Sequence, residues 1–415
     1  MPRKRVIYQS ESLFCAATGA YDAAGTSNAS VSGNAGDPAR PGSGIQVHRV
    51  QSINYGFDVP RQDVNEFGKL ARIDQVILES PTVSLDFTYY AETGFNERTI
   101  GLTLNDATTD STANNQISAI SGILNGNTDI KSYFIRTVSE GLDEQDADGD
   151  AAYVEAAHTE ASIIALGNVS ITSYTFEAAV GSFPTVSVSA EGLNMTILAA
   201  PKDSDGTNGT GTALTAATVN QETGANQDHA FVLEKGVDAM VQAKLGNNTL
   251  TDVLPSALRP GDIVFVDKLK AENASDNTLI KGWDVSELKI QSVSVSVDLG
   301  REDLLKLGSK FAFSKEVVYP VTASMTIEAQ VSDMKSFDLA DLVSADTNKY
   351  DAAFYIKQPG LSKQAIGFRI KGAKLDSQAI SSSIGDNKSV SLNFTTQVGG
   401  PSDDANGLFV QRGES

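Results

Sequence analysis

The residues with the most ligand-like chemistry in this 415-residue chain lie in one acidic run, at 144–155. Oxygen-bearing side chains stand at its first, third, fifth and twelfth positions with a glycine at the sixth, close to the pattern of a calcium-binding loop. The candidate metal ligands are Glu144, Asp146, Asp148, Asp150 and Glu155. Glutamate at the first position and alanine at the eighth depart from the pattern, and the flanks do not predict a strong helix pair. Two interpretations stay open, a calcium site and a solvated acidic loop.

Residues suited to catalysis are scarce. The three histidines, His48, His158 and His229, lie far apart in unrelated contexts, and we expect each to be a surface or packing residue. The chain contains no nucleophile-elbow, zinc-protease, phosphate-loop, dinucleotide-binding or CxxC pattern. Carboxylate pairs of the kind that glycosidases use do not stand out from the acidic background. We therefore expect a protein that is not an enzyme and that has no cofactor besides the calcium considered above.

Composition narrows the classes of partner. A net charge of −20 opposes tight binding of nucleic acid, although an acidic wall would let nucleic acid slide past. An equally simple interpretation is that the charge keeps an abundant protein soluble. Cys15 is the only cysteine, which suits assembly in a reducing cytoplasm. No apolar run has the form of a signal peptide or a membrane span, so we expect neither export nor a membrane partner.

Regular alternation of apolar and small polar residues predicts a mainly β fold. In residues 292–298 (SVSVSVD) valines alternate with serine and aspartate, and residues 52–58 repeat the pattern. Similar alternation occurs at 83–89, 168–172, 185–190, 323–329 and 389–395. Such strands belong to antiparallel sheets that have one packed face and one wet face. Short flanking helices are predicted at 114–124, 302–308 and 334–344, where the apolar spacing lengthens.

An internal repeat organises the chain. Residues 50–68 (VQSINYGFDVPRQDVNEFG) recur in altered form at 290–308 (IQSVSVSVDLGREDLLKLG), at an offset of 240. The identical pairs are Gln51/Gln291, Ser52/Ser292, Asp58/Asp298, Arg61/Arg301, Asp63/Asp303 and Gly68/Gly308. The offset is kept at 83–89/323–329, then falls to 221 at 133–136/354–357 and to 204 at 186–188/390–392. Two copies of one fold unit in a chain indicate symmetry or assembly more than a single active site.

The repeat predicts two tandem domains of one fold, at 1–198 and 258–400. The falling offset places about 36 additional residues of the first copy within 91–165. The Gly/Thr/Asn-rich stretch at 199–257 is interpreted as a linker or insertion, and 401–415 as a C-terminal tail.

Both copies also contain a long, charged link between two paired strands, at 59–80 and 299–320. Each link is too long for a tight hairpin. Because it occurs in both copies, the link is a candidate contact arm; a surface excursion without a role is the other interpretation.

With these features the chain resembles the phage tail tube (major tail) proteins. The resemblance lies in the Gln-Ser-Val/Ile strand, the Arg-x-Asp-Val/Leu-x-x-x-Gly loop and the return strand Tyr319-Pro-Val-Thr322. It covers both copies, about three quarters of the chain.

The resemblance implies a β-sandwich unit with a flanking helix, whose inner sheet joins those of its neighbours into a barrel around a lumen. Rings, usually of six units, stack into the tube through which the genome passes. The chain would then be a virion protein of the tail, assembled in the host cytoplasm, with tape measure, terminator and sheath proteins as neighbours and genomic DNA in transit. The residues implied to face the lumen are Ser52, Asn54, Asp58, Ser292, Ser294, Ser296 and Asp298. The residues implied to lie in ring-stacking loops are Arg61, Asp63, Gly68, Arg301, Asp303 and Gly308.

Two units in each chain predict a ring of three chains acting as six, because closing the sheet into a barrel removes its exposed edges. A calcium-dependent surface adhesin or carbohydrate-binding β-module is the competing hypothesis. It accounts for the acidic run but not for the expected lack of an export signal or for the two long links. Another ring component of a tail, such as a terminator or baseplate protein, is a third interpretation.

Overall fold

The computed structural model has a mainly β fold, as the sequence predicts. It describes residues 11–17, 43–105, 117–124, 131–137, 162–198, 239–241, 257–265, 270–271, 288–305, 307, 312, 314–331, 349–359, 363–382, 387–400, 403 and 405–412. Within these residues the helical elements are short: α1 (Phe95–Ile100), α2 (Ser121–Leu124) and the 3-10 turn η4 (Pro260–Asp262). No helix in these ranges is long and apolar enough to cross a membrane.

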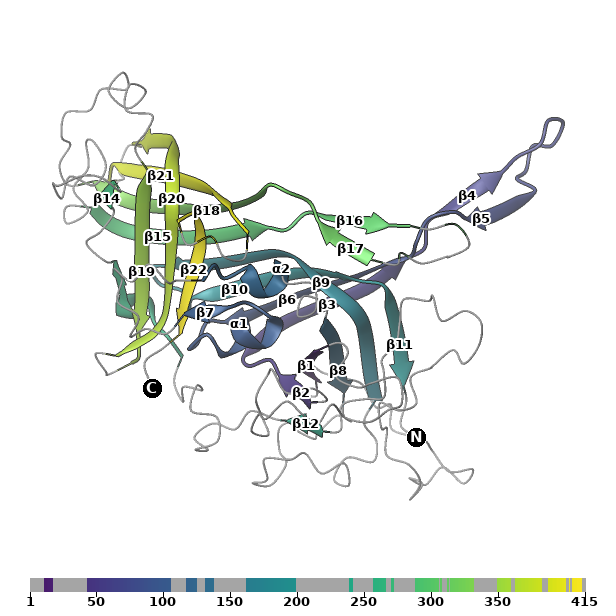
Figure 1. The fold of residues 1–415 in the computed structure, drawn as a ribbon, viewed down its shortest axis with the longest axis horizontal. Coiled ribbons are helices and arrows are strands. Elements are labelled where there is room, and N and C mark those ends of the chain that lie inside the picture. Colours follow the sequence, from purple (N-terminus) through teal and green to yellow (C-terminus); the bar gives the residue numbers. More distant parts are fainter. Residues whose placement is uncertain are drawn as a thin grey trace.

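One antiparallel sheet forms the body of the molecule (Figure 1). Its strands, in spatial order, are β3 (Val50–Asp58), β6 (Thr82–Tyr90), β10 (Thr185–Gly192), β9 (Ser162–Ala179), β15 (Leu288–Asp298), β18 (Val321–Val331), β21 (Ser389–Val398) and β20 (Gln364–Ser381). The alternating residues form strands because every second side chain can enter the core. The sheet does not close on itself: among the described residues, β3 and the C-terminal half of β20 each have a neighbouring strand on one side only. We refer to it as the main sheet.

Shorter strands form a second layer over the apolar face of the main sheet, and one buried cluster fills the space between the layers. β9 and β20 are 18 residues long, and their N-terminal halves belong to this second layer. Behind the first four strands lie β1 (Glu11–Ala17), β2 (Ser43–Gln46), β8 (Lys131–Thr137), β11 (Asn194–Leu198) and β12 (Ala239–Val241). Behind the last four lie β13 (Ile263–Phe265), β14 (Lys270–Ala271), β19 (Tyr350–Lys357), β22 (Gly407–Arg412) and β7 (Leu104–Asn105).

The two halves of the main sheet repeat one pairing register. Strand β3 pairs with β6 as β15 pairs with β18, so that Ile53 lies opposite Phe87 and Val293 opposite Ile327. The register shifts at the same place in both pairs, beside Gln51 and beside Gln291. The remaining strands agree in the same way. Val186 lies opposite Tyr89 as Val390 lies opposite Ala329, and Ser187 lies opposite Thr175 as Ser391 lies opposite Ala379. The bulges also correspond, because the shift at Ser189/Ala190 skips Thr172 of β9 and the shift at Leu375/Ser377 skips Asp376 of β20, 204 positions later.

The two long links are not irregular loops. The first forms a hairpin of β4 (Arg61–Val64) and β5 (Asp74–Ile77), and the second forms a hairpin of β16 (Arg301–Leu304) and β17 (Ser314–Val317). Both have the same register, with Arg61 opposite Ile77 and Arg301 opposite Val317. We call them the first arm and the second arm. The first arm projects far beyond the body of the molecule (Figure 1).

Several sequence predictions need correction. The helix predicted at 302–308 is wrong where the chain is described, because cross-strand pairing in the second arm makes residues 302–304 part of β16. The predicted C-terminal tail contains the buried strand β22, which completes the second layer. In the described part of the predicted helix at 114–124, residues 117–120 are not helical and residues 121–124 form α2; 334–344 lies outside the described residues. Helix α1 was not predicted.

Candidate functional site

The seven residues that the resemblance assigns to a lumen lie on one face of the main sheet. Ser52, Asn54 and Asp58 are exposed on β3, and the three serines of β15 are half-buried while Val293, Val295 and Val297 enter the core. Hydroxyl groups on this face bond across strands: Ser52 Oγ lies 2.6 Å from Thr88 Oγ1, Ser296 Oγ lies 2.7 Å from Ser324 Oγ, and Ser292 Oγ donates to Glu328 Oε2 at 2.8 Å. We call this surface the polar face.

Carboxylates outnumber cations on the polar face. The central parts of its eight strands, at 52–58, 82–88, 185–191, 173–179, 292–298, 322–328, 389–395 and 377–381, contain no Lys or Arg. Lys374 lies opposite Thr395 at one end of this face, and the ammonium group of Lys315 contacts Glu191. The pairing registers place six carboxylates on this face: Asp58, Asp86, Glu177, Glu191, Asp298 and Glu328. Four of them were not predicted, because polar-face residues were assigned only on the repeated strand. The same alternation in the neighbouring strands was the signal that could have found them. A surface with an excess of carboxylates opposes the binding of phosphate groups.

The two free edges of the main sheet expose apolar side chains that the equivalent interior strands bury. Phe57 on edge strand β3 is 65% exposed, whereas Val297, 240 positions later on β15, is 4% exposed. Ile380 on edge strand β20 is 44% exposed, whereas Phe176, 204 positions earlier on β9, is fully buried. Exposed apolar residues on unpaired strand edges favour pairing with another chain.

The second arm is attached to the first half of the sheet. Arg301 donates from Nε and Nη2 to the carbonyl oxygen of Ile171, both at 3.1 Å. The buried ammonium group of Lys315 lies 2.8 Å from Glu191 Oε2 and 3.0 Å from Asp303 Oδ1. Arg301 and Asp303 therefore make contacts within the chain, and their assignment to ring stacking stays a prediction.

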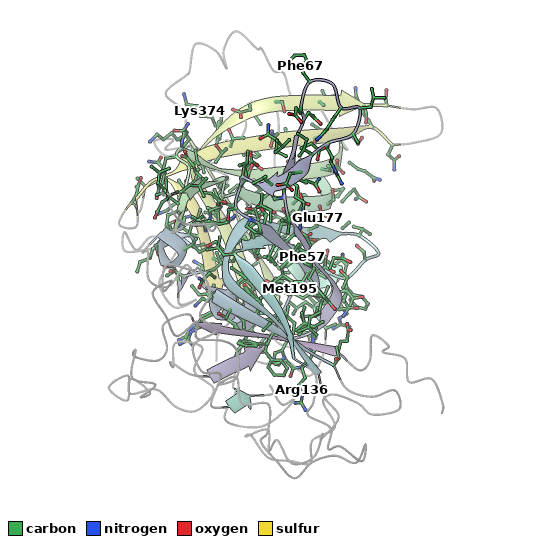
Figure 2. All side chains as sticks on the ribbon, turned by 90° about the vertical axis from the view of Figure 1, so that its right-hand side faces the viewer. Phe57, Phe67, Arg136, Glu177, Met195 and Lys374 are labelled. Atoms are coloured by element: carbon green, nitrogen blue, oxygen red, sulfur yellow. The ribbon has the colours of Figure 1, made fainter. Side chains whose placement is uncertain are left out.

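Among the described residues, the first arm makes no such contact with the sheet, and it is mostly exposed. Asp63 accepts a hydrogen bond from Arg72 Nη1 at 3.0 Å, and Gly68 has a φ of 90°, which favours glycine in the turn. Phe67 lies at the tip and points away from the molecule (Figure 2). Phe67 and Leu70 are fully exposed. Gly308, the counterpart of Gly68, lies outside the described residues.

A buried charged cluster lies beside α1, and sequence reasoning missed it. Glu97 Oε1 accepts hydrogen bonds from the hydroxyl groups of Tyr89 at 2.9 Å and Tyr174 at 3.3 Å. Arg49 Nε lies 2.7 Å from Oε1 of the buried Glu92. Burial raises the pKa of Glu97, and burial raises that of Glu92 to about 7 even though Arg49 lowers it. Burial and, next, Arg49 lower the pKa of His48 to about 4, so this imidazole is neutral near pH 7.

Glu92 should make stability depend on pH. Its native pKa of about 7 exceeds the ordinary glutamate value of 4.5, so its contribution to stability is present below pH 4.5 and is lost as the pH rises through 7. The pKa of His48 is lowered, so its contribution to stability is present above pH 6.5 and is lost as the pH falls towards 4. In Glu92→Gln the first effect disappears. From pH 4.5 to 7.5, we expect the free energy of unfolding of the wild type to fall by about 3 kcal/mol relative to this variant in urea titrations. A difference that is constant over this range would contradict the assignment.

The calcium prediction lies outside the described residues, since all five candidate ligands fall between 138 and 161. Within the described ranges, no group of three His, Cys, Asp or Glu side chains is placed to hold a metal ion. Cys15 is buried, and burial raises the pKa of its thiol to about 11. His158 and His229 also lie outside the described residues.

Comparisons of the sequence give no relative: no protein-family model matches the chain, and no curated protein matches it significantly. The class that the fold defines is therefore the broad one of mainly β proteins with a large antiparallel sheet.

Proposed function

We propose that this chain is a structural virion protein that polymerises into stacked rings and forms the tube of a phage tail. Its role is that of a conduit wall and not of an enzyme. The observation that carries the proposal is the repeated register of the main sheet, because it supports two equivalent units side by side, with a free edge at each end among the described residues.

Each unit combines four strands of the main sheet, an arm and a second layer. This arrangement supports a duplicated β-sandwich in one chain. The pairing of β9 with β15 joins the two proposed units edge to edge, which supports the same kind of joining between the chains of a ring. Two different edges that join head to tail generate a ring when the rotation closes.

The layers decide which face would line the lumen. The apolar face is covered by the second layer, so a closed barrel of main sheets leaves the polar face inside. The excess of carboxylates over cations on this face supports a wall past which DNA moves without binding. Three chains would provide six units for one ring.

The arms supply contacts beyond the sheet. The exposed apolar tip of the first arm, with Phe67 and Leu70, suits contact with a neighbouring ring. Tape measure, terminator and sheath proteins are the other partners that a tail tube requires.

Purified protein should form rings or tubes when examined by negative-stain electron microscopy. Cryo-EM reconstruction should show three chains per ring with six similar units, because each chain supplies two. Six chains per ring would contradict the pseudo-sixfold arrangement, and a protein that stays monomeric at all concentrations would contradict the tube and favour an adhesin or carbohydrate-binding module.

A further inference from the structure

We propose that the C-terminal half of β20 pairs antiparallel with β3 of a second copy of this chain, in the register that places Ser381 opposite Asn54. This interface rests on the proposed function, since it names the contact between neighbouring chains of a ring. The register itself follows from the junction between the two halves of one chain.

That junction is the pairing of β9 with β15. It places Ser294 opposite Glu177 and Val297 opposite Tyr174. Equivalent positions differ by 240 residues between β3 and β15, and by 204 between β9 and β20. Transferring the junction by these offsets gives the pairs Asn54↔Ser381, Tyr55↔Ile380, Gly56↔Ala379, Phe57↔Gln378 and Asp58↔Ser377.

The transfer is justified because β9 and β20 have the same irregularities. Each skips one residue opposite its neighbour in the main sheet, at Thr172 in β9 and at Asp376 in β20. Each also has a residue with positive φ where it leaves the second layer, Asn168 at 50° and Gly372 at 64°. All of these positions differ by 204. Since a bulge fixes the direction of the side chains that follow, both strands present the same faces to a partner.

The exposed apolar side chains on the two edge strands indicate that these edges form the two sides of one interface. In the junction inside the chain, Val297 and Phe176 are buried between the layers. The equivalent Phe57 and Ile380 are 65% and 44% exposed, although they lie on the same apolar face. The proposed register sets Tyr55 beside Ile380, which continues the core across the two chains. Pairing would also cover the unpaired backbone of both strands.

The arm contacts transfer in the same way. Arg301 binds the carbonyl oxygen of Ile171, and the equivalent pair across two chains is Arg61 with the carbonyl of Leu375. The ion pair of Lys315 with Glu191 would become a neutral pair, because Gln75 and Thr395 occupy the equivalent positions. Because both equivalent residues are neutral, the interface between chains would bury no charge without an opposite partner at this place. The first arm, exposed in the single chain, thereby gains the support that the second arm has.

Paired cysteines test the register. In Asn54→Cys/Ser381→Cys the two thiols lie at opposite edges of one chain, so a disulfide must join two chains. Mild oxidation of assembled protein should give a ladder on non-reducing gels that ends at three chains. The yield should exceed that of Asn54→Cys/Ser377→Cys, which is displaced by about 13 Å along the strand, by about tenfold or more. The native Cys15 can stay, because it is buried.

Ser294→Cys/Glu177→Cys is the matched positive control, since it places thiols at the equivalent pair within the chain and should form an intramolecular disulfide. If tubes form and the displaced pair cross-links to the same extent as the proposed pair, the proposed register is wrong but the proposed tube is not contradicted. If tubes form without any cross-link between chains, while the internal control forms its disulfide, the register is likewise wrong and the tube is not contradicted. Cross-links at the proposed pair without rings or tubes would support the interface and contradict the tube.

Discussion

Phe176→Ala should lower the free energy of unfolding by about 3–5 kcal/mol. Phe176 is fully buried in β9, and its ring centroid lies 4.4 Å from that of Phe368 and 5.6 Å from that of Phe354. Strand β9 belongs to the first half of the main sheet, whereas both partners belong to the second layer of the other half. Truncation therefore leaves a cavity at the junction of the halves. Chemical denaturation followed by circular dichroism would measure the loss.

Phe57→Ala is the matched control. Phe57 lies on the apolar face of edge strand β3, where it is 65% exposed in the single chain. Its truncation should change the stability of the monomer by no more than about 0.5 kcal/mol, as is usual for exposed positions. Assembly should be impaired, because the interface between copies would bury this ring. Equal losses of monomer stability in the two variants would refute the assignment of β9 to the interior and β3 to an edge.

Reversing two of the charges on the polar face should impair passage of DNA. Asp58→Lys/Asp298→Lys changes that face by four charge units per chain and places ammonium groups where the wall now has carboxylates. Lysines that line a channel bind phosphates with an affinity that falls steeply with salt. We expect genome ejection from assembled particles to slow by about tenfold or more at low salt, with partial recovery as salt rises. Release of DNA over time from receptor-triggered particles would measure this.

Neutral variants separate charge from shape in this experiment. Asp58→Asn/Asp298→Asn keeps the size and hydrogen-bonding capacity of both side chains and adds no cation. Ejection should stay close to that of the wild type, provided that tubes of normal length assemble. If the lysine variant also ejects DNA at the normal rate at every salt concentration, these two side chains do not shape the channel.

The sequence predicted the strands and their faces well because the alternation of side chains is local. The valines of β15 enter the core and its serines lie on the polar face, as the period of two indicates. Local spacing was misleading at 302–304, where pairing with β17 overrides the apolar spacing that suggested a helix. The cluster of Glu92, Glu97 and Arg49 was out of reach, because its members gather only after β3, β6 and α1 have packed.

By itself, the sequence determined that this chain is mainly β, that it contains a repeat, and which side chains of each strand share a face. Those properties depend on periodicity and on similarity between segments, which need no knowledge of contacts. The tertiary structure decided which strands are neighbours, and therefore that Val297 is buried whereas Phe57 is exposed. Burial depends on neighbouring strands that lie far away in the sequence. Two equivalent positions therefore differ in exposure when one strand has a neighbour on both sides and the other has a neighbour on one side only.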